Sequence, residues 1–454
     1  MYIGKICTVK TGKGVAMSNK FKLAKDGLLD AINPKKDLKN LYMLLVGISA
    51  VAFFVLCLVM GNGTNATLFF RNGTDFFMDC FNQIRDCAQG KEVYSERHVI
   101  YPPMANLIFL ILSRFTRNVY NDSNFEMRYS WKIYSSSLIL LMLIFAVCAI
   151  TMFALIFKVT KRGSVNRRMV FAAMATLSVP ILYMLERGNM LILCVIALLV
   201  YAFSYHSDSK FAREIGLLAL AFAFSLKLYP AVFGWFLIAD KRYREAIRCV
   251  IYGVAMLILP SFFFGGPIFV IKTLYANVTS WSSGSGNDLL RAMQALNFSE
   301  GQQGFVNALI YVWILVCAVC FALSPFLRPE KPWKTWILGI ITILCVPSLT
   351  GLYTWAFLLI PLIMLTDRET VQSKHMAYVV LITVPFMFIP LGMFSLQPLL
   401  NLIAPGVSAP SLSLATIWIY VMTAVLSIFV VVDTLIDFGR IFTKKKLEKE
   451  KIQS

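Results

Sequence analysis

Acidic side chains stand in a stretch that is otherwise rich in large apolar residues, DFFMDCFNQIRD. If this stretch is helical, four polar side chains share one face of it: Asp75, Asp79, Asn82 and Asp86. A carboxylate beside an apolar cavity can act as a general base on a hydroxyl group, or it can hold a metal ion. The alternative is a solvated helix face. That alternative suits Asp86 better than Asp75 or Asp79, because large aromatic side chains flank those two.

The stretch MLERGNMLIL interrupts a long apolar segment with three polar side chains, Glu186, Arg187 and Asn189. Gly188 lets the backbone turn, so that the Arg187 guanidinium can enter a cavity and bind a phosphate through two parallel hydrogen bonds. The alternative is a short hairpin in which Glu186 and Arg187 pair in the headgroup region of a membrane. Ionisable groups inside apolar segments are functional by default, so both interpretations stay open.

Lys227 is the only charged residue of the long apolar segment that contains KLYPAVFGWFLI. Pro230 is expected to break a helix there, so that freed backbone carbonyls and an ammonium group coincide. The alternative is a lysine at a helix end that reaches toward the membrane surface. Taken together, Arg187 and Lys227 predict an outward-facing cationic site opposite the acidic stretch.

The stretch ERHVIYPPMAN breaks the chain just before another apolar segment. Its two prolines suit the first turn of a helix, and a plain helix start explains them fully. It does not explain His98 and Tyr101, which we therefore include among the candidate binding residues.

The composition is typical of a protein with many membrane-spanning helices. Of 454 residues, 58% are hydrophobic and 15% are charged, which is far less charge than a soluble domain of this length carries. The formal net charge is +19, yet the basic residues fall in short connections between apolar segments, as Lys331, Lys334 and Lys374 do. Such clusters alternate with connections that lack them, which is the positive-inside pattern. The charge therefore predicts membrane orientation, with membrane lipids and no nucleic acid as partners.

We predict an all-α polytopic membrane protein with about twelve transmembrane helices and both termini in the cytoplasm. Residues 1–40 form a basic cytoplasmic segment without a signal-peptide pattern, residues 41–438 form the transmembrane domain, and residues 439–454 form a basic tail. The predicted spans are 41–60, 134–158, 169–185, 190–206, 214–228, 229–239, 248–265, 306–326, 335–348, 352–366, 376–394 and 413–438. Several are short, and helix breaks are expected at 186–189, 227–230 and 347–355.

Two external loops are expected, at 61–132 and 266–304. In the first, YPPMANLIFLILSRF has an apolar part that is too short to span and suits an interfacial helix. The second is rich in Gly, Ser and Asn and is predicted to be mobile. Asn-X-Ser/Thr triplets fall in these loops, at Asn62, Asn65, Asn72, Asn121, Asn277 and Asn297. P-loop, GxSxG and HExxH patterns are absent, so ATP-driven transport, serine hydrolysis and zinc chemistry have little support.

At these residues the chain resembles the multi-spanning glycosyltransferases of the C type, and within them glycosyltransferase family 87, the polyprenol-phosphate-mannose-dependent mannosyltransferases. The resemblance rests on DFFMDCFNQI followed by Gly90 and Tyr94, then YPP, RGN, and KLYP with the basic turn DKRYREA. These motifs occur in the family's order over residues 40–250, and the C-terminal half is similar only in being hydrophobic and helical. The resemblance implies a GT-C-like helical bundle.

The resemblance further implies an inverting transfer of a hexose, with mannose foremost, from a polyprenyl-phosphate donor to a lipid-linked or cell-envelope glycan. The reaction is expected at the extracytoplasmic face of the plasma membrane. The family's general base can be assigned to Asp79 or Asp75, of which Asp79 is favoured. From their charge, we expect Arg187 and Lys227 to bind the donor phosphate. Candidate substrate-binding residues are Asn82, Glu186, Asn189, Tyr229, Tyr101 and His98. No cofactor is expected, although paired acids can hold a divalent metal ion.

Two other classes of protein compete with this prediction. In a transporter or flippase of lipid-linked glycans, the acids and cations would form a pathway through the bilayer, and charges in the C-terminal spans would favour it. Residues 335–365 hold none. A polymerase of envelope polysaccharides would be expected to place essential arginines in a late external loop, but 266–304 holds only Lys272 and Arg291 as basic residues.

Overall fold

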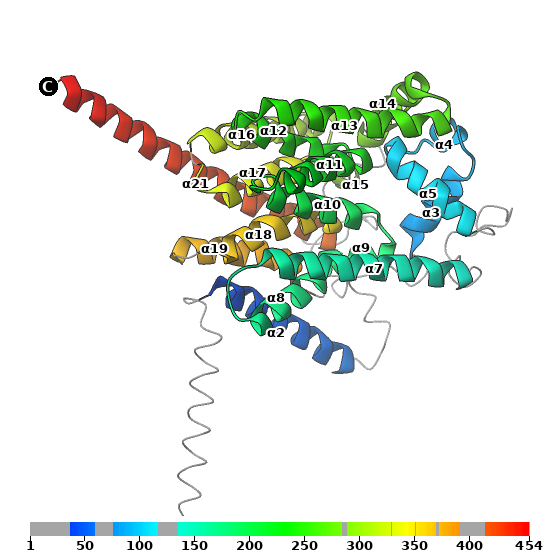
Figure 1. Cartoon of the computed structure of the whole chain (residues 1–454), viewed down its shortest axis with the longest axis horizontal. Helices are drawn as coiled ribbons and strands as arrows, with labels where there is room; N and C mark the ends of the chain where they lie inside the picture. Colours follow the sequence, from blue (N-terminus) through cyan, green and yellow to red (C-terminus); the bar gives the residue numbers. More distant parts are fainter. Residues whose placement is uncertain are drawn as a thin grey trace, which may run out of the picture.

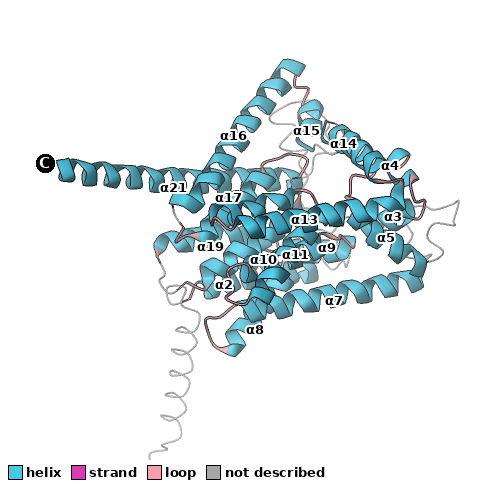
Figure 2. Cartoon of the chain, turned by 45° about the horizontal axis from the view of Figure 1, so that its top comes forward, coloured by secondary structure: helices cyan, strands magenta, loops and turns pink. Residues whose placement is uncertain are grey.

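The computed structural model of the chain consists of helices and loops, without a strand in the part that it describes (Figure 2). The described residues are 37–59, 76–116, 135–283, 288–327, 329–349, 351–368, 372–389 and 414–453. Most helices lie side by side in one bundle, and α3, α4 and α5 gather at one end of it (Figure 1). The prediction of an all-α protein is confirmed for these residues.

The helices of the first part of the chain are α2 (Leu38–Val59), α3 (Met78–Cys87), α4 (Glu92–Ser95), α5 (Pro103–Phe115), α7 (Ser135–Val159), α8 (Val165–Thr176), α9 (Val179–Arg187), α10 (Leu191–Ser204), α11 (Lys210–Leu226), the 3-10 helix η3 (Tyr229–Gly234) and α12 (Trp235–Ala239). The second part contains α13 (Tyr243–Ser261), η4 (Phe262–Phe264), α14 (Pro267–Ser283), α15 (Asp288–Ala295), α16 (Glu300–Leu327), α17 (Pro332–Leu344), η5 (Leu352–Leu358), α18 (Leu359–Thr366), α19 (Ser373–Thr383), η6 (Val384–Phe386) and α21 (Leu414–Gln453).

Five helices in the described part are long and apolar enough to cross a membrane: Leu38–Val59, Ser137–Val159, Tyr243–Phe264, Glu300–Leu327 and Ile417–Thr443. The pair α8 and α9 forms a sixth candidate with a bend of 50°. The predicted span over 169–185 is therefore bent, because Ser178 is extended and Pro180 lies in the first turn of α9. The other predicted spans coincide with shorter helices, and the count of about twelve crossings stays a prediction.

The helix breaks expected from the sequence are present in the structure. Helix α9 ends at Arg187, α11 ends at Leu226, and η5 follows α17 after a gap. The broken ends meet, since the ring of Tyr183 on α9 stacks on Tyr353 of η5 at 6.0 Å, and the ring of Tyr229 on η3 lies 5.9 Å from Phe357. Non-helical backbone at membrane depth is stable where protein buries it, as these contacts do.

The core beside these breaks is aromatic. The indole of Trp336 on α17 lies 4.4 Å from the ring of Phe233 and 5.0 Å from that of Phe236. The Tyr201 hydroxyl on α10 donates a hydrogen bond of 3.0 Å to the Phe233 carbonyl, one of the backbone groups that a 3-10 helix end leaves open. These contacts hold η3 in place, and η3 fixes the position of the Lys227 segment that precedes it.

The second external segment differs from its prediction. Residues 266–304 were expected to form a mobile loop, whereas α14, α15 and the start of α16 occupy much of this range. On α14, the buried Asn277 donates hydrogen bonds from Nδ2 to the carbonyls of Tyr94 (2.9 Å) and Val99 (3.2 Å). This Asn-X-Thr triplet therefore serves packing, because its amide holds the non-helical segment that leads into α5.

The boundaries of the bundle also differ from the sequence prediction. Helix α2 begins at Leu38, inside the predicted basic segment, and Lys39 is fully buried. Its ammonium group donates to the Thr366 carbonyl (3.0 Å) and lies 2.6 Å from a carboxylate oxygen of Asp367. At the other terminus, α21 continues through the predicted tail and extends away from the bundle (Figure 1).

Three lysines that the sequence assigned to membrane orientation form ion pairs between helices. Lys334 on α17 is 1% exposed and lies 2.6 Å from Asp433 and 2.7 Å from Asp437 of α21. Lys331 pairs with Asp437 at 2.8 Å, and Lys374 pairs with Asp433. Charges thus do lie in the C-terminal helices, and each of these five has a partner that joins α17 or α19 to α21.

We predict that Lys334→Met destabilises the protein, because two buried carboxylates lose their shared counter-charge. The expected loss is about 3 kcal/mol, seen as a lower midpoint of thermal unfolding in detergent. Lys331→Met is the control, since the Lys331 side chain is 26% exposed and, among the described residues, pairs with the single carboxylate of Asp437. Equal effects of the two substitutions would contradict a special role for the buried lysine.

Candidate active site

The RGN turn is built by a left-handed helix end. Gly188 has φ 61°, its N–H donates to the Leu185 carbonyl (3.2 Å), and the Asn189 N–H donates to the Met184 carbonyl (2.9 Å). This pair of hydrogen bonds is the usual way to close a helix with glycine. The Asn189 side chain then accepts a bond of 2.9 Å from the Leu191 N–H. The turn therefore fixes the directions of the side chains on both sides of the glycine.

Helix α3 is anchored on this turn. The Phe77 N–H donates a hydrogen bond of 2.8 Å to the Glu186 carbonyl, and Phe77 has a φ of 58°. A Cβ atom at Gly188 would lie 2.8 Å from the Phe77 ring and 2.9 Å from Cβ of Cys80. Only glycine allows this approach, which brings the start of α3 against the end of α9. Glu186 thus contributes a main-chain acceptor to the junction.

The approach places Asp79 against both polar side chains of the turn. Arg187 donates from Nε (3.1 Å) and from a terminal nitrogen (2.5 Å) to Oδ1 of Asp79, and Asn189 donates from Nδ2 to Oδ2 (2.8 Å). The Asp79 side chain is 22% exposed and that of Arg187 is 12% exposed. A charge-assisted pair of this kind is strong and directional. The carboxylate is oriented from both oxygens and keeps an accessible edge.

The other acids of the opening stretch are placed differently. Helix α3 begins at Met78, after the left-handed Phe77, and Asp75 lies outside the described residues. Asp86 is buried and pairs with its neighbour Arg85 at 2.8 Å. Burial raises the pKa of Asp86, and the Arg85 charge opposes that shift. Asp86 therefore belongs to a local ion pair, and Asp79 is the acid that meets the turn.

Asn82 lies one turn beyond Asp79 on α3. Its Oδ1 atom is buried and has no hydrogen-bond donor among the described residues. An acceptor in this condition is available to a hydroxyl group of a bound molecule. The substrate-binding role expected for Asn82 stays a prediction, and it would use this acceptor.

Lys227 supplies a second cation. It follows the last residue of α11 in an extended conformation, and its Nζ lies 3.7 Å from the centroid of the Tyr101 ring. An ammonium group over an aromatic face is stabilised by the ring quadrupole. The charges of Lys227 and Asp79 also interact electrostatically. One carboxylate and two cations, from three segments far apart in the chain, thus form a single cluster.

Tyrosines surround this cluster. Burial raises the pKa of Tyr101 well above its ordinary value, and the negative charge of Asp79 adds to the shift, so its hydroxyl stays protonated. Tyr229 and Tyr353 also interact electrostatically with Tyr101 or with each other. Sequence reasoning did not select Tyr183 and Tyr353, whose stacked rings line the junction of α9 and η5. The sequence feature that could have pointed to Tyr353 is the helix break expected at 347–355, which contains this residue.

His98 is the predicted residue for which the structure gives no link to this cluster. Its side chain is exposed, between α4 and α5, on a backbone with φ 50°. In the described part of the chain, no three His, Cys, Asp or Glu side chains come together as metal ligands. The cluster is built from carboxylate, guanidinium, ammonium, amide and phenol groups.

The fold and the site together define a class of protein. Its described part is helical and largely apolar, and it holds an oriented carboxylate beside two cations. The sequence model of glycosyltransferase family 87 matches residues 99–347, which is more than half of the 454 residues, and the chain belongs to this family. It is therefore a membrane glycosyltransferase. The match includes Tyr101, Arg187 and Lys227, begins after Asp79, and extends further into the C-terminal half than the motifs had indicated. No curated protein and no solved structure matches the chain.

We predict that Gly188→Ala destabilises the protein more than Gly90→Ala does. Both glycines have φ near 60°, at 61° and 66°, so both substitutions strain the backbone, by about 1–2 kcal/mol. No atom lies within 4 Å of a Cβ built at Gly90, whereas Gly188 would also collide with α3. Thermal unfolding in detergent measures the difference. A shift at Gly188 no larger than that at Gly90 would show that the close approach is not required.

Proposed function

We propose that the protein transfers a hexose, with mannose as the first candidate, from a polyprenyl-phosphate donor to a lipid-linked or cell-envelope glycan. Family membership supports sugar transfer in a membrane. The observation that carries the proposal is the Asp79 carboxylate, held by Arg187 and Asn189 with Lys227 nearby. The proposed reaction needs a base to take the proton of the attacking hydroxyl group. It also needs cations to stabilise the departing phosphate, and both are present at this site.

In the proposed reaction, Asp79 accepts the proton of the acceptor hydroxyl as its oxygen attacks the anomeric carbon. The bond from that carbon to the phosphate oxygen breaks, and the polyprenyl phosphate leaves with the electron pair. Attack and departure on opposite sides of the carbon invert its configuration. Each carboxylate oxygen can accept more than one hydrogen bond, so Asp79 can bind the hydroxyl while Arg187 and Asn189 hold it.

The two cations have different proposed tasks. Arg187 donates two hydrogen bonds to Asp79, so its first task is to orient the base, and its positive charge also lies near the leaving phosphate. Lys227 has no carboxylate within ion-pair distance among the described residues and is the main proposed phosphate ligand. Two cations and one anion leave the cluster net positive, which favours an anionic donor.

The position of the site along the helices supports a reaction at one membrane face. The ring of Phe145 on α7 contacts Phe77 beside the site, at 5.3 Å, and the Lys161 N–H just after α7 bonds to Asp367. Fourteen residues of helix, from Phe145 to the end of α7 at Val159, separate these points, a rise of about 21 Å at 1.5 Å per residue, which is most of the roughly 30 Å hydrocarbon thickness of a bilayer. The Lys161 end carries basic connections, so we propose that it is cytoplasmic and that Asp79 is extracytoplasmic.

We predict that Asp79→Asn lowers sugar transfer from a short-chain polyprenyl-phosphate mannose by about 10²- to 10⁴-fold, because the general base is lost. Donor binding should stay within about threefold, since the amide is nearly isosteric. Purified protein in detergent, assayed with and without EDTA, gives the measurement. We propose that transfer is insensitive to EDTA, since no metal is assigned to the mechanism.

Asp86→Asn is the matched control, since it makes the same change on the same helix at an acid that pairs with Arg85. Its transfer rate should stay near that of the wild type. Asp75→Asn tests the other candidate base. Normal transfer by Asp79→Asn together with loss in Asp75→Asn would move the base to Asp75. Absence of transfer by the wild type with mannose, glucose, galactose and arabinose donors would reject the proposed reaction.

We predict that Lys227→Gln weakens donor binding by about 10- to 100-fold, because a charge-assisted hydrogen bond to the phosphate is lost. The dissociation constant for the donor and the rate at saturating donor are both measured. Lys272→Gln is the control, since Lys272 is exposed on α14. A change in acceptor KM with unaltered donor affinity would assign Lys227 to the acceptor.

A further inference from the structure

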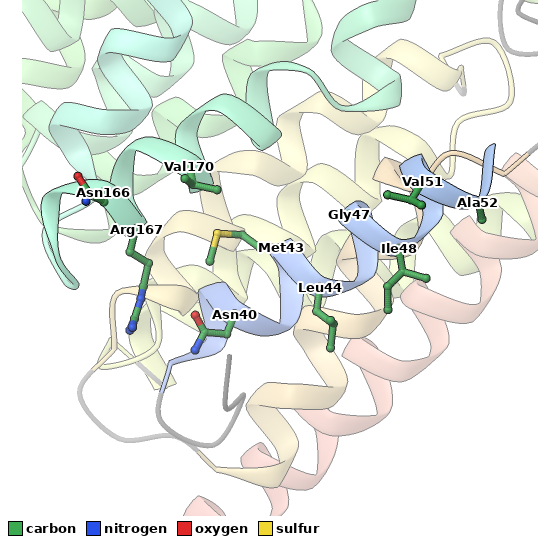
Figure 3. Close-up of a pocket in the computed structure, with 10 residues that line it drawn as sticks. All are labelled: Asn40, Met43, Leu44, Gly47, Ile48, Val51, Ala52, Asn166, Arg167 and Val170. Carbon is green, nitrogen blue, oxygen red and sulfur yellow. The ribbon is translucent and has the colours of Figure 1, made fainter. Parts of the chain in front are cut away.

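A cavity lies between α2 and α8, away from the proposed active site. It has a volume of about 760 Å³. Its wall is mostly apolar and includes Leu44, Ile48 and Val51 of α2 and Val170 of α8, with Gly47 near the middle of its α2 side (Figure 3). Ile48 and Val51 are 59% and 65% exposed, so the cavity opens to the hydrocarbon of the membrane. We call it the α2–α8 groove.

One end of the α2–α8 groove is polar. Figure 3 shows Asn40 and Arg167 at this end, and Val51 and Ala52 at the other. Arg167 also lines a second, polar pocket of about 180 Å³, whose wall includes Arg162, Arg368 and Asp37. The two spaces share Arg167 as a lining residue, so the apolar groove adjoins a group of arginines.

The charges of the polar pocket do not balance. Among the residues that line it, Asp37 is the acid, and it accepts bonds from Arg167 (3.2 Å) and from the Lys39 N–H (2.9 Å). The pocket is left with a net charge of +2, since three arginines face one aspartate. Arg162 donates to the Arg368 carbonyl, which leaves the pocket's positive charge unneutralised. The Nε atom of Arg368 is buried and has no acceptor among the described residues, a condition that is unfavourable unless an acceptor binds.

The start of α8 adds to this field. Gly163 lines the polar pocket and immediately precedes Ser164, the N-cap of α8. The N-terminus of a helix carries a partial positive charge and favours anions. The arginines and the helix end therefore act in the same direction, toward a bound anion.

We propose that the α2–α8 groove and the arginine pocket bind one membrane phospholipid with an anionic headgroup. Its phosphate lies among Arg162, Arg167 and Arg368, and an acyl chain follows α2. The groove runs from Asn40 to Ala52, a rise of about 18 Å, which matches the acyl chains of one leaflet of a bilayer with a core of about 30 Å. The net positive charge selects an anionic lipid over a zwitterionic one.

This lipid site is distinct from the proposed donor site. The polar pocket includes the connection that follows α7, whereas Phe77, two residues before Asp79, contacts Phe145 near the middle of that helix, 14 residues before its end. The inference does not depend on the identity of the transferred sugar. It concerns a second lipid held at the other membrane face, where it joins α2, the α7–α8 connection and the end of α18.

The test uses the full chain, purified in detergent and incubated with phosphatidylglycerol or phosphatidylcholine of the same acyl chains. Native mass spectrometry counts the bound lipids, and inorganic phosphate is added as a competitor. We expect the wild type to retain phosphatidylglycerol at least about tenfold better than phosphatidylcholine. The double variant Arg162→Gln/Arg368→Gln should lose this preference, and Arg244→Gln should keep it, because Arg244 is exposed outside the pocket.

A second variant tests the apolar part without touching a charge. Gly47→Leu fills the middle of the groove, and a Cβ atom there makes only an ordinary contact with Met174, at 3.5 Å. It should lower phosphatidylglycerol retention about tenfold while the protein unfolds at the wild-type temperature. Equal retention of the two lipids by the wild type, or unchanged retention in both variants, would reduce the site to non-selective lipid contact. Competition by inorganic phosphate that persists in Gly47→Leu would show a site for free phosphate and overturn the lipid proposal.

Discussion

The ion pair between Asp79 and Arg187 is the interaction on which the site depends. It joins residues that are 108 positions apart, and it forms only because α3 can rest directly on the end of α9. Gly188 makes that approach possible, and the left-handed Phe77 turns the chain into α3 with its N–H on the Glu186 carbonyl. The carboxylate, the turn and the start of α3 are therefore one unit.

The broken helices of the bundle serve the same unit. An unbroken α9 would carry Arg187 past the site, and an unbroken α11 would leave Lys227 on a helix surface. Each break exposes backbone groups that need partners, and the structure supplies them from neighbouring breaks and from the aromatic core around Trp336. The irregular segments are thus concentrated in one region, where their side chains converge. Elsewhere the bundle consists of regular helices, whose apolar faces can pack against lipid or against one another.

Local features of the chain predicted much of this arrangement. Gly188 and Pro230 marked the helix breaks, and isolated charges in apolar segments marked Arg187 and Lys227, because such signals act within one or two turns. The partners of these charges were not predictable, since Asp79 pairs with a residue 108 positions away while Asp86 pairs with its neighbour. Distant partners also explain why the role of Lys334 was not predicted. The sequence assigned it to membrane orientation, but it is buried between two aspartates of α21. The start of α3 also differed, because nothing in the sequence marks Phe77 as left-handed.

The hydrogen bonds of Asn277 have a consequence for the biosynthesis of the protein. Its amide satisfies the carbonyls of Tyr94 and Val99, which precede it by 183 and 178 residues. A ribosome adds about 5–20 residues per second, so the segment before α5 waits roughly 10–35 s for this partner. During that time the start of the chain, Asp79 included, must be inserted without its final support. The order of synthesis therefore makes assembly of the site a late event, completed only after more than half of the chain has entered the membrane.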